Sequence, residues 1–130
     1  LNQMLNLCKN KDFVFASRYL KDGGSDDDTF LTLIGNYIFS SIGNIFFSLK
    51  LSDILFTFLL GKTNSFKKLE LKSNDFCLCV EMPIKAKKFN MNFIDIPSYE
   101  RKRFGGKKKV NEFVDGFKIL IYMIKCFFKI

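Results

Sequence analysis

The sequence contains no histidine, and its 130 residues include only two prolines and four cysteines. Without histidine, the chain has no Ser-His-Asp triad, no histidine general base and no histidine metal ligand. Four cysteines are too few for a disulfide-stabilised scaffold, and neither an internal repeat nor a collagen-like period is present. The 17 Phe and 4 Tyr residues exclude a disordered chain, because they supply ample apolar surface for a buried core.

The cysteines do not form a recognisable metal-binding pattern. Cys77 and Cys79 form a single C-x-C pair, whereas Cys8 and Cys126 stand alone among apolar residues. A structural zinc site needs two such pairs or additional histidines. We therefore expect four free thiols, as in a protein of the reducing cytoplasm.

Positive charge is concentrated toward the carboxyl-terminal end of the chain. The net charge of +8 arises from residues 84–130, which hold twelve Lys or Arg and four Asp or Glu, while positions 1–83 have nine of each sign. Such a basic segment indicates an anionic partner, for which phosphate, nucleic acid and an anionic membrane surface are the alternatives.

Hydrophobic periodicity predicts an α/β fold. Alternating or continuous apolar runs predict strands over residues 12–19 and 91–97, and residues 53–60 are expected to form a strand or an irregular buried segment. Helical spacing predicts the remaining ordered elements, and glycine and charge predict two loops at residues 21–28 and 99–109. No membrane-spanning helix is expected, since Lys50 and Asp53 interrupt the apolar stretch 38–60. The predicted helices cover residues 1–9, 29–49, 65–69, 75–88 and 110–130.

The three consecutive aspartates at residues 26–28 allow two interpretations. Carboxylates suit Mg²⁺ or Mn²⁺, and a D-x-D motif can hold such a metal against a nucleotide diphosphate. However, that motif should follow an apolar strand, whereas this triplet follows Gly23 and Gly24 in a predicted loop. We expect the acids to cap the following helix and complement its dipole, and we assign no metal ligand in this chain.

Residues 99–109 combine six cations with two adjacent glycines. Glycine lets backbone N–H groups approach an anion closely, and arginine can bind phosphate oxygens in a bidentate manner. The pattern therefore favours a phosphate-binding loop, with a solvated run of charges as the alternative.

Residues 110–130 form an otherwise apolar helix with a narrow polar stripe. A wide apolar face bordered by lysines is typical of a helix that lies in a membrane interface. A helix packed on the protein's own sheet has a similar pattern, and this alternative stays open. The stripe consists of Asn111, Asp115, Lys118, Tyr122, Lys125 and Lys129.

Four segments resemble, in order, the C-terminal half of family 2 glycosyltransferases, especially those that act on polyprenyl-phosphate carriers near membranes. Residues 12–19 with the glycine pair 23–24 resemble the family's dfv-x-GSRy…gg strand and loop. Residues 51–58 resemble its l-s-D-x-x-x-G-F segment, and residues 75–86 resemble its gF…E…kA helix. The most specific match is R-x-x-G-x-S-K…dG at residues 103–116, preceded by P-x-x-y/e-R at residues 97–101.

The resemblance implies part of a GT-A (Rossmann-like) fold. Residues 1–109 would be a partial catalytic domain that contains the acceptor half, and residues 110–130 would be a C-terminal amphipathic helix packed on the domain or on a membrane surface. The N-terminal nucleotide-binding half of the family is not in this sequence, so we expect this chain to be a fragment or a remnant that is inactive alone. That half would supply the nucleotide contacts and the ligands of a divalent metal, Mg²⁺ or Mn²⁺. The chain departs from the family at Ala16 and Thr57, where glycine is usual, and at Lys108, where serine is usual.

Family 2 enzymes invert configuration at the anomeric carbon of a nucleotide-sugar, with a carboxylate that orients or deprotonates the acceptor. Asp53 is the candidate catalytic carboxylate, because it is the only acid between residues 29 and 60. An acid that caps a turn or pairs with a lysine is the alternative, and an already ionised phosphate acceptor would need Asp53 only for positioning. The residues assigned by resemblance to the acceptor phosphate or the leaving diphosphate are Ser17, Arg18, Arg103, Gly106, Lys108 and Lys109.

The expected partners are a nucleotide-sugar donor and either a lipid-phosphate or a glycan acceptor of the cell envelope. The expected location is cytoplasmic and peripheral, at the inner face of the membrane, and no nucleic acid partner is expected. The alternative function is a non-catalytic basic module that binds RNA or acts as a membrane-surface scaffold, although the motifs of common RNA-binding modules are missing.

Overall fold

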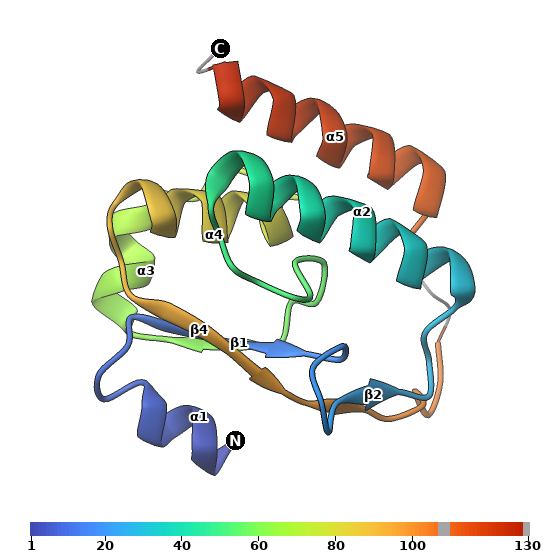
Figure 1. Cartoon of the computed structure of the whole chain (residues 1–130), viewed down its shortest axis with the longest axis horizontal. Coiled ribbons are helices and arrows are strands. Elements are labelled where there is room, and N and C mark those ends of the chain that lie inside the picture. The colour runs from blue at the N-terminus through green and yellow to red at the C-terminus, as the bar shows by residue number, and fades with distance from the viewer. Residues whose placement is uncertain (107–109, 129–130) are drawn as a thin grey trace.

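The computed structural model describes residues 1–106 and 110–128 and shows a small mixed sheet with helices on both sides (Figure 1). Helix α1 covers one side of the sheet, α2 and α4 cover the other, and α5 forms an outer layer beyond α2. The predicted α/β class is therefore confirmed. In chain order the elements are α1 Asn2–Leu7, β1 Phe13–Ser17, β2 Gly24–Ser25, α2 Phe30–Phe47, β3 Leu59–Gly61, α3 Thr63–Leu69, α4 Leu78–Lys88, β4 Phe93–Pro97, β5 Tyr99–Glu100 and α5 Glu112–Phe128.

Strand β1 is the centre of the main sheet, whose order is β3-β1-β4. It pairs antiparallel with β3 and parallel with β4, in a register that places Phe13 opposite Phe93 and Ser17 opposite Pro97. All five residues of β1 are buried, which explains their continuous apolar character, since a strand covered on both faces needs no polar side. The predicted strands at residues 12–19 and 91–97 are confirmed.

The core is divided between the two faces of this sheet. Because side chains alternate along a strand, Phe13 and Phe15 belong to a large cluster with α3, α4 and α5, whereas Val14 and Ala16 pack with Met4 of α1. Ile119 and Met123 bring α5 into the large cluster. The helix predicted near residues 110–130 is thus present, and its inner side helps to close the core.

Two of the predicted loops contain short strands. Residues 24–25 and 99–100 form a parallel two-stranded sheet, β2-β5, in which Gly24 is opposite Tyr99 and Ser25 is opposite Glu100. Two-residue strands carry no periodic signal, so composition alone indicates loops here. Residues 53–58 are irregular, and the expected strand is limited to β3.

Helix α2 meets the length and composition criteria for crossing a membrane, and only 17% of it is buried. It begins after Thr29, whose side chain accepts a hydrogen bond from the N–H group of Thr32 (3.2 Å), and it ends at Ser48 in a left-handed conformation. Unlike the stretch 38–60 considered above, the helix contains no charged residue. The criterion concerns length and composition only.

Candidate functional site

A polar cluster forms at the carboxyl ends of the parallel strands β1 and β4. Arg18 follows β1, Glu100 ends β5, and Asp53 lies in the irregular segment before β3. In open α/β sheets this edge is the usual place for ligands, because the loops that leave the strands converge there. The cluster therefore occupies the expected position for a functional site.

Arg18 and Asp53 form the centre of the cluster. The Nε and Nη2 groups of Arg18 donate hydrogen bonds to the two carboxylate oxygens of Asp53, at 2.7 and 3.0 Å. The backbone N–H group of Arg18 donates a third bond to Oδ2 of Asp53, at 3.0 Å. The Asp53 side chain has an exposed fraction of 0% and that of Arg18 is 7%. This is a buried bidentate ion pair, the geometry in which Arg and carboxylate bind most strongly.

Two further carboxylates and two aromatic rings surround Arg18. Its Nη1 group donates to Oε2 of Glu100 at 3.2 Å and lies 3.8 Å from Oδ1 of Asp28. The guanidinium carbon is 4.7 Å from the ring centre of Phe56 and 5.2 Å from that of Tyr19. Burial alone lowers the pKa of Arg18, but the hydrogen bonds and charge of Asp53 raise it above its ordinary value. Arg18 therefore stays charged.

A second hydrogen-bonded chain lies beside the ion pair. The Oγ of Ser52 donates to Oδ2 of Asp95 at 2.6 Å, so the Oγ of Ser17, 2.6 Å away, donates to Ser52. The backbone N–H of Ser52 also donates to Asp95, at 2.8 Å, and that of Tyr19 donates to Ser17, at 3.2 Å. Ser17 is wholly buried, so in this arrangement it joins β1 to residue 52 and offers no open hydroxyl.

Glycine is required where the β2 loop passes over β1. A Cβ atom at Gly23 would lie 2.8 Å from the backbone oxygen of Ser17, and one at Gly24 would lie 2.8 Å from the Tyr99 ring. A side chain at Gly23 would therefore separate the β2 loop from β1, whereas one at Gly24 would have to displace the exposed Tyr99 ring. The glycine pair thus lets Ser25 approach Glu100, to which its Oγ donates at 2.7 Å.

The three aspartates at residues 26–28 each have a different partner. Asp26 accepts from the Tyr99 hydroxyl at 2.5 Å, Asp27 accepts from Arg103, and Asp28 accepts from the Tyr19 hydroxyl. The expectation that they cap α2 is wrong, because Thr29 is the capping residue; Asp28 only accepts from the Thr29 N–H, at 3.1 Å. Burial and this contact with Asp28 raise the pKa of Tyr19.

The basic loop is only partly described. Arg103 donates from Nε to Asp27 at 2.9 Å, with Nη2 at 2.8 Å, and its side chain is 43% exposed. Gly106 is exposed with φ +84°, a conformation that favours glycine. Lys108 and Lys109 lie outside the described residues. Of the predicted phosphate-binding residues, Arg103 and Gly106 are therefore open to solvent, whereas Ser17 and Arg18 are not.

Asp53, the candidate catalytic carboxylate of the sequence analysis, lies in the cluster with both its oxygens bonded to Arg18. Its partner is an arginine 35 positions earlier, not a neighbouring lysine. Three further residues complete the cluster without having been predicted for it, namely Ser52, Asp95 and Glu100, and Asp28 was predicted only as a helix-capping acid. Ser52 and Glu100 each had one available signal, because they lie inside the matched segments 51–58 and 97–101.

The four cysteines are free thiols, in agreement with the sequence expectation. Burial raises the pKa of Cys77 to about 11 and that of Cys79 to about 12, so both stay protonated at neutral pH. Within residues 1–106 and 110–128, no group of three or more Cys, Asp or Glu side chains has the geometry to hold a metal ion.

Comparison of the chain with protein-family models, curated proteins and solved structures finds no match. The resemblance to family 2 glycosyltransferases therefore depends on the residues quoted above and on their placement.

Proposed function

We propose that this chain is the acceptor half of an inverting family 2 glycosyltransferase with a GT-A fold. It would help to transfer a sugar from a nucleotide-sugar to a polyprenyl phosphate or, as the other acceptor class, to a cell-envelope glycan. The observation that supports this most directly is the convergence of segments that resemble the family separately. Arg18, Asp53 and Glu100 come from three of the four segments and meet in one hydrogen-bonded cluster.

The geometry favours a phosphate acceptor over a glycan hydroxyl. A hydroxyl needs a carboxylate base that can reach it, but Asp53 is fully buried and both its oxygens face Arg18. A phosphate oxygen is already ionised and can attack the anomeric carbon without such a base. Asp53 is then a positioning residue that holds Arg18. The exposed Arg103 and Gly106 would bind the acceptor phosphate or the departing diphosphate, together with Lys108 and Lys109, which lie outside the described residues.

The donor nucleotide and its Mg²⁺ or Mn²⁺ ion would be bound outside this chain, in the N-terminal half that the resemblance implies. The proposed location is the cytoplasmic face of a membrane, where a polyprenyl phosphate presents its headgroup. The alternative of a non-catalytic membrane-surface scaffold is favoured by one specific observation, the exposed apolar faces of α2 and α5 described below.

Titration of the chain with geranyl phosphate, followed by ³¹P NMR, tests the acceptor site without the donor half. Arg103→Ala should weaken binding at least tenfold, which corresponds to about 1.4 kcal/mol. Lys87→Ala is the matched control, because it removes one exposed cation from α4, outside the cluster, and should not change the affinity. In an enzyme that contains both halves, Arg103→Ala should lower kcat/KM by a similar factor.

Equal affinity of the wild type, Arg103→Ala and Lys87→Ala would show that residues 99–109 are a solvated charge run. Binding of geranyl phosphate that is matched by geraniol would show that the phosphate is not recognised. Either result would overturn the proposed acceptor site.

A further inference from the structure

Helix α2 has its polar side facing inward and its apolar side facing outward. Its buried residues are Asn36, Ser40 and Gly43. Its exposed residues are apolar or aromatic, with Asn44 as the exception: Phe30, Leu31, Leu33, Ile34, Tyr37, Ile38, Ile45 and Phe46. A helix on the surface of a water-soluble domain has the opposite arrangement.

The two buried polar side chains of α2 are hydrogen-bonded within the protein. The amide of Asn36 donates to the carbonyl oxygen of Ser52 at 3.2 Å and accepts from the N–H of Leu55 at 3.1 Å. Ser40 accepts from the N–H of Ile54 at 3.1 Å. These bonds fix the rotation of α2 about its axis, so the apolar side must face away from the protein.

Helix α5 also exposes a largely apolar side, although its buried residues are apolar as well. Its two buried residues are Ile119 and Met123, and its inward side also carries the half-buried Asp115 and Tyr122 of the predicted polar stripe. Lys118 and Lys125 are exposed at the edge of this stripe. The other exposed side chains of α5 are all apolar, namely Phe113, Val114, Phe117, Leu120, Ile121, Ile124, Phe127 and Phe128.

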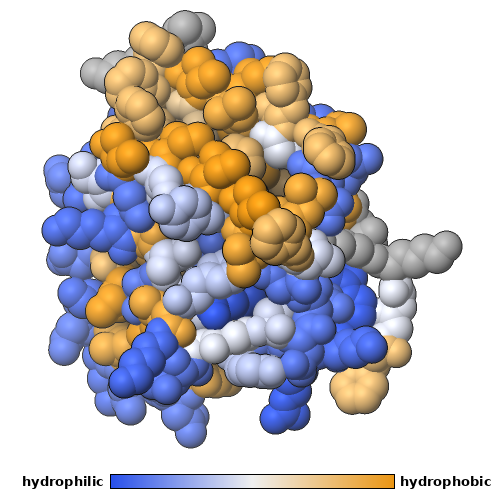
Figure 2. All heavy atoms as spheres, turned by 45° about the vertical axis from the view of Figure 1, so that its right-hand side comes forward, coloured by the Kyte–Doolittle hydropathy of each residue, from blue (hydrophilic) through white to orange (hydrophobic). Residues whose placement is uncertain are grey.

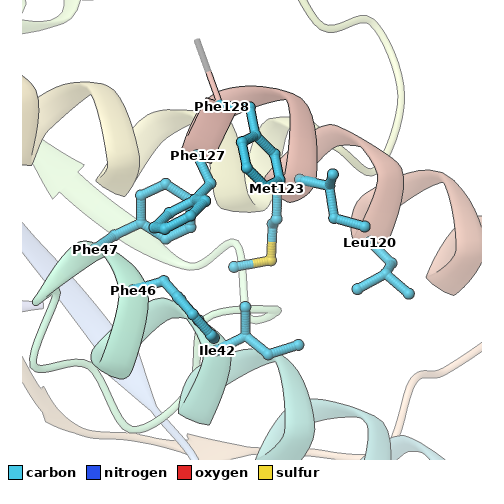
Figure 3. Close-up of a pocket in the computed structure, with 8 residues that line it drawn as sticks. Ile42, Phe46, Phe47, Leu120, Met123, Phe127 and Phe128 are labelled. Atoms are coloured by element: carbon cyan, nitrogen blue, oxygen red, sulfur yellow. The ribbon is translucent and has the colours of Figure 1, made fainter. Parts of the chain in front are cut away.

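The two apolar sides join into one surface, here called the α2–α5 face. The ring of Phe127 lies 5.2 Å from that of Phe46 and 6.3 Å from that of Phe47, both edge-on. Figure 2 shows apolar side chains gathered over α5 and α2, above a more hydrophilic region. Between the helices is a groove of about 310 Å³ with an entirely apolar lining that includes Ile42, Met123 and Phe128 (Figure 3).

We propose that the α2–α5 face inserts into the hydrocarbon of one membrane leaflet, with acyl chains filling the groove. Apolar patches of this extent are not left open to water on monomeric proteins. A protein partner would be matched by polar groups among the apolar ones, whereas the exposed side chains here are nearly uniformly apolar across two helices. Exposed Lys118 and Lys125 lie beside the face, where they complement anionic headgroups.

The proposed membrane contact is larger than the last helix. From the sequence, membrane contact is expected only of residues 110–130, with packing on the protein's own sheet as the alternative. The exposed residues add the uncharged helix α2 to the proposed contact. It does not depend on the proposed transferase activity, because the vesicle experiments below contain no donor or acceptor.

Co-sedimentation with vesicles of phosphatidylcholine and phosphatidylglycerol tests the insertion. Ile45→Lys places a charge on the α2–α5 face, and we expect it to lower the partition coefficient at least tenfold. The added positive charge distinguishes insertion from electrostatic adsorption, because adsorption to an anionic surface would be strengthened by it. Leu5→Lys is the control: Leu5 is also exposed, but α1 lies on the other side of the sheet (Figure 1).

Measuring how deeply a side chain enters the bilayer tests the insertion without Ile45→Lys, which could fail to fold. The chain has no tryptophan, so Phe117→Trp introduces a single tryptophan, which can be excited selectively over the four tyrosines, on α5. On vesicles its emission should shift to the blue and be quenched by lipids brominated along their acyl chains. A tryptophan introduced by Leu5→Trp should show neither effect.

Three results would overturn the proposal: no vesicle binding by the folded wild type, equal or stronger binding by Ile45→Lys, or a tryptophan at 117 that acyl-chain bromines do not quench. Analytical sedimentation without lipid tests whether a second copy of the chain covers the α2–α5 face instead. A dimer that Ile45→Lys dissociates, together with no vesicle binding, would identify the α2–α5 face as an interface between two copies of this chain.

Discussion

At the scale of single residues, the ion pair between Arg18 and Asp53 is the contact on which the cluster most depends. Asp53→Ala should lower the free energy of unfolding by about 3–5 kcal/mol, because it leaves a buried guanidinium without its main partner. Asp27→Ala removes a carboxylate from the half-exposed Arg103 and should cost less than about 1 kcal/mol. Urea unfolding of both variants measures the difference, and similar losses would contradict the buried geometry.

The buried carboxylate of Glu81 should make the free energy of unfolding depend on pH. It accepts from Lys85 Nζ at 2.8 Å and from the N–H groups of Lys72 and Ser73 at 2.9 and 2.8 Å. Burial raises its pKa, but these bonds outweigh burial and lower it from 4.5 to about 2. The lowered pKa stabilises the folded state above about pH 4.5, and this stabilisation is lost as the pH falls toward 2.

Glu81→Gln removes this charge and should therefore remove the pH-dependent part of the stability. At neutral pH the variant should be less stable than wild type by on the order of 3 kcal/mol, and the difference should vanish between about pH 4.5 and pH 2. Urea unfolding at a series of pH values measures it. Glu70→Gln, which removes an exposed carboxylate, should give a curve parallel to wild type. A constant gap between Glu81→Gln and wild type down to pH 2 would exclude this role of Glu81.

At the scale of elements, α2 holds the segment that carries Ser52 and Asp53. Asn36 and Asn44 each make two hydrogen bonds to that segment; those of Asn44 join its amide to the backbone of Leu51 at 2.9 and 3.0 Å. The two asparagines differ in burial, since Asn36 is 1% exposed and Asn44 is exposed. They therefore form a matched pair for measuring what burial contributes to this contact.

Asn36→Ala should destabilise the fold by about 2–3 kcal/mol, because the Ser52 carbonyl and the Leu55 N–H group lose a partner that is itself buried. Asn44→Ala should cost about 1 kcal/mol or less, because water can replace the amide. Chemical denaturation gives both values. If the two variants lost equal stability, the inward placement of Asn36 would be wrong.

At the scale of the whole molecule, charge and apolar surface should act on membrane binding separately. Lys118→Glu with Lys125→Glu changes the net charge from +8 to +4. Each lysine contributes about 1 kcal/mol near an anionic surface, so removing two should weaken binding to anionic vesicles by at least about 2 kcal/mol. Binding to neutral vesicles should be unchanged, because insertion of apolar side chains does not need the charge.

The control for this pair is Lys67→Glu with Lys68→Glu, which makes the same change of net charge on α3. Co-sedimentation at low salt should separate the two double variants on anionic vesicles. Equal weakening would show that only the net charge matters and that the lysines of α5 have no special position.

The sequence by itself determined those helices and strands whose apolar residues recur at regular spacing. The apolar runs of β1 and β4 and the long spacing pattern of α5 are properties of neighbouring residues, so they are visible before folding. The concentration of basic residues after position 84 and the absence of histidine are likewise independent of the fold.

The tertiary structure alone decided which distant residues meet and which side of each helix faces inward. Arg18 and Asp53 are 35 positions apart, and the β2-β5 pair joins residues 75 positions apart, so neither contact has a local signal. The periodicity of α5 separates a polar stripe from an apolar side, but it is silent on which of them packs against the protein. The orientation of α5 depends on α2, against which it packs. Two asparagines of α2 are hydrogen-bonded to residues 51–55, so the apolar side of α2 faces outward and continues into that of α5.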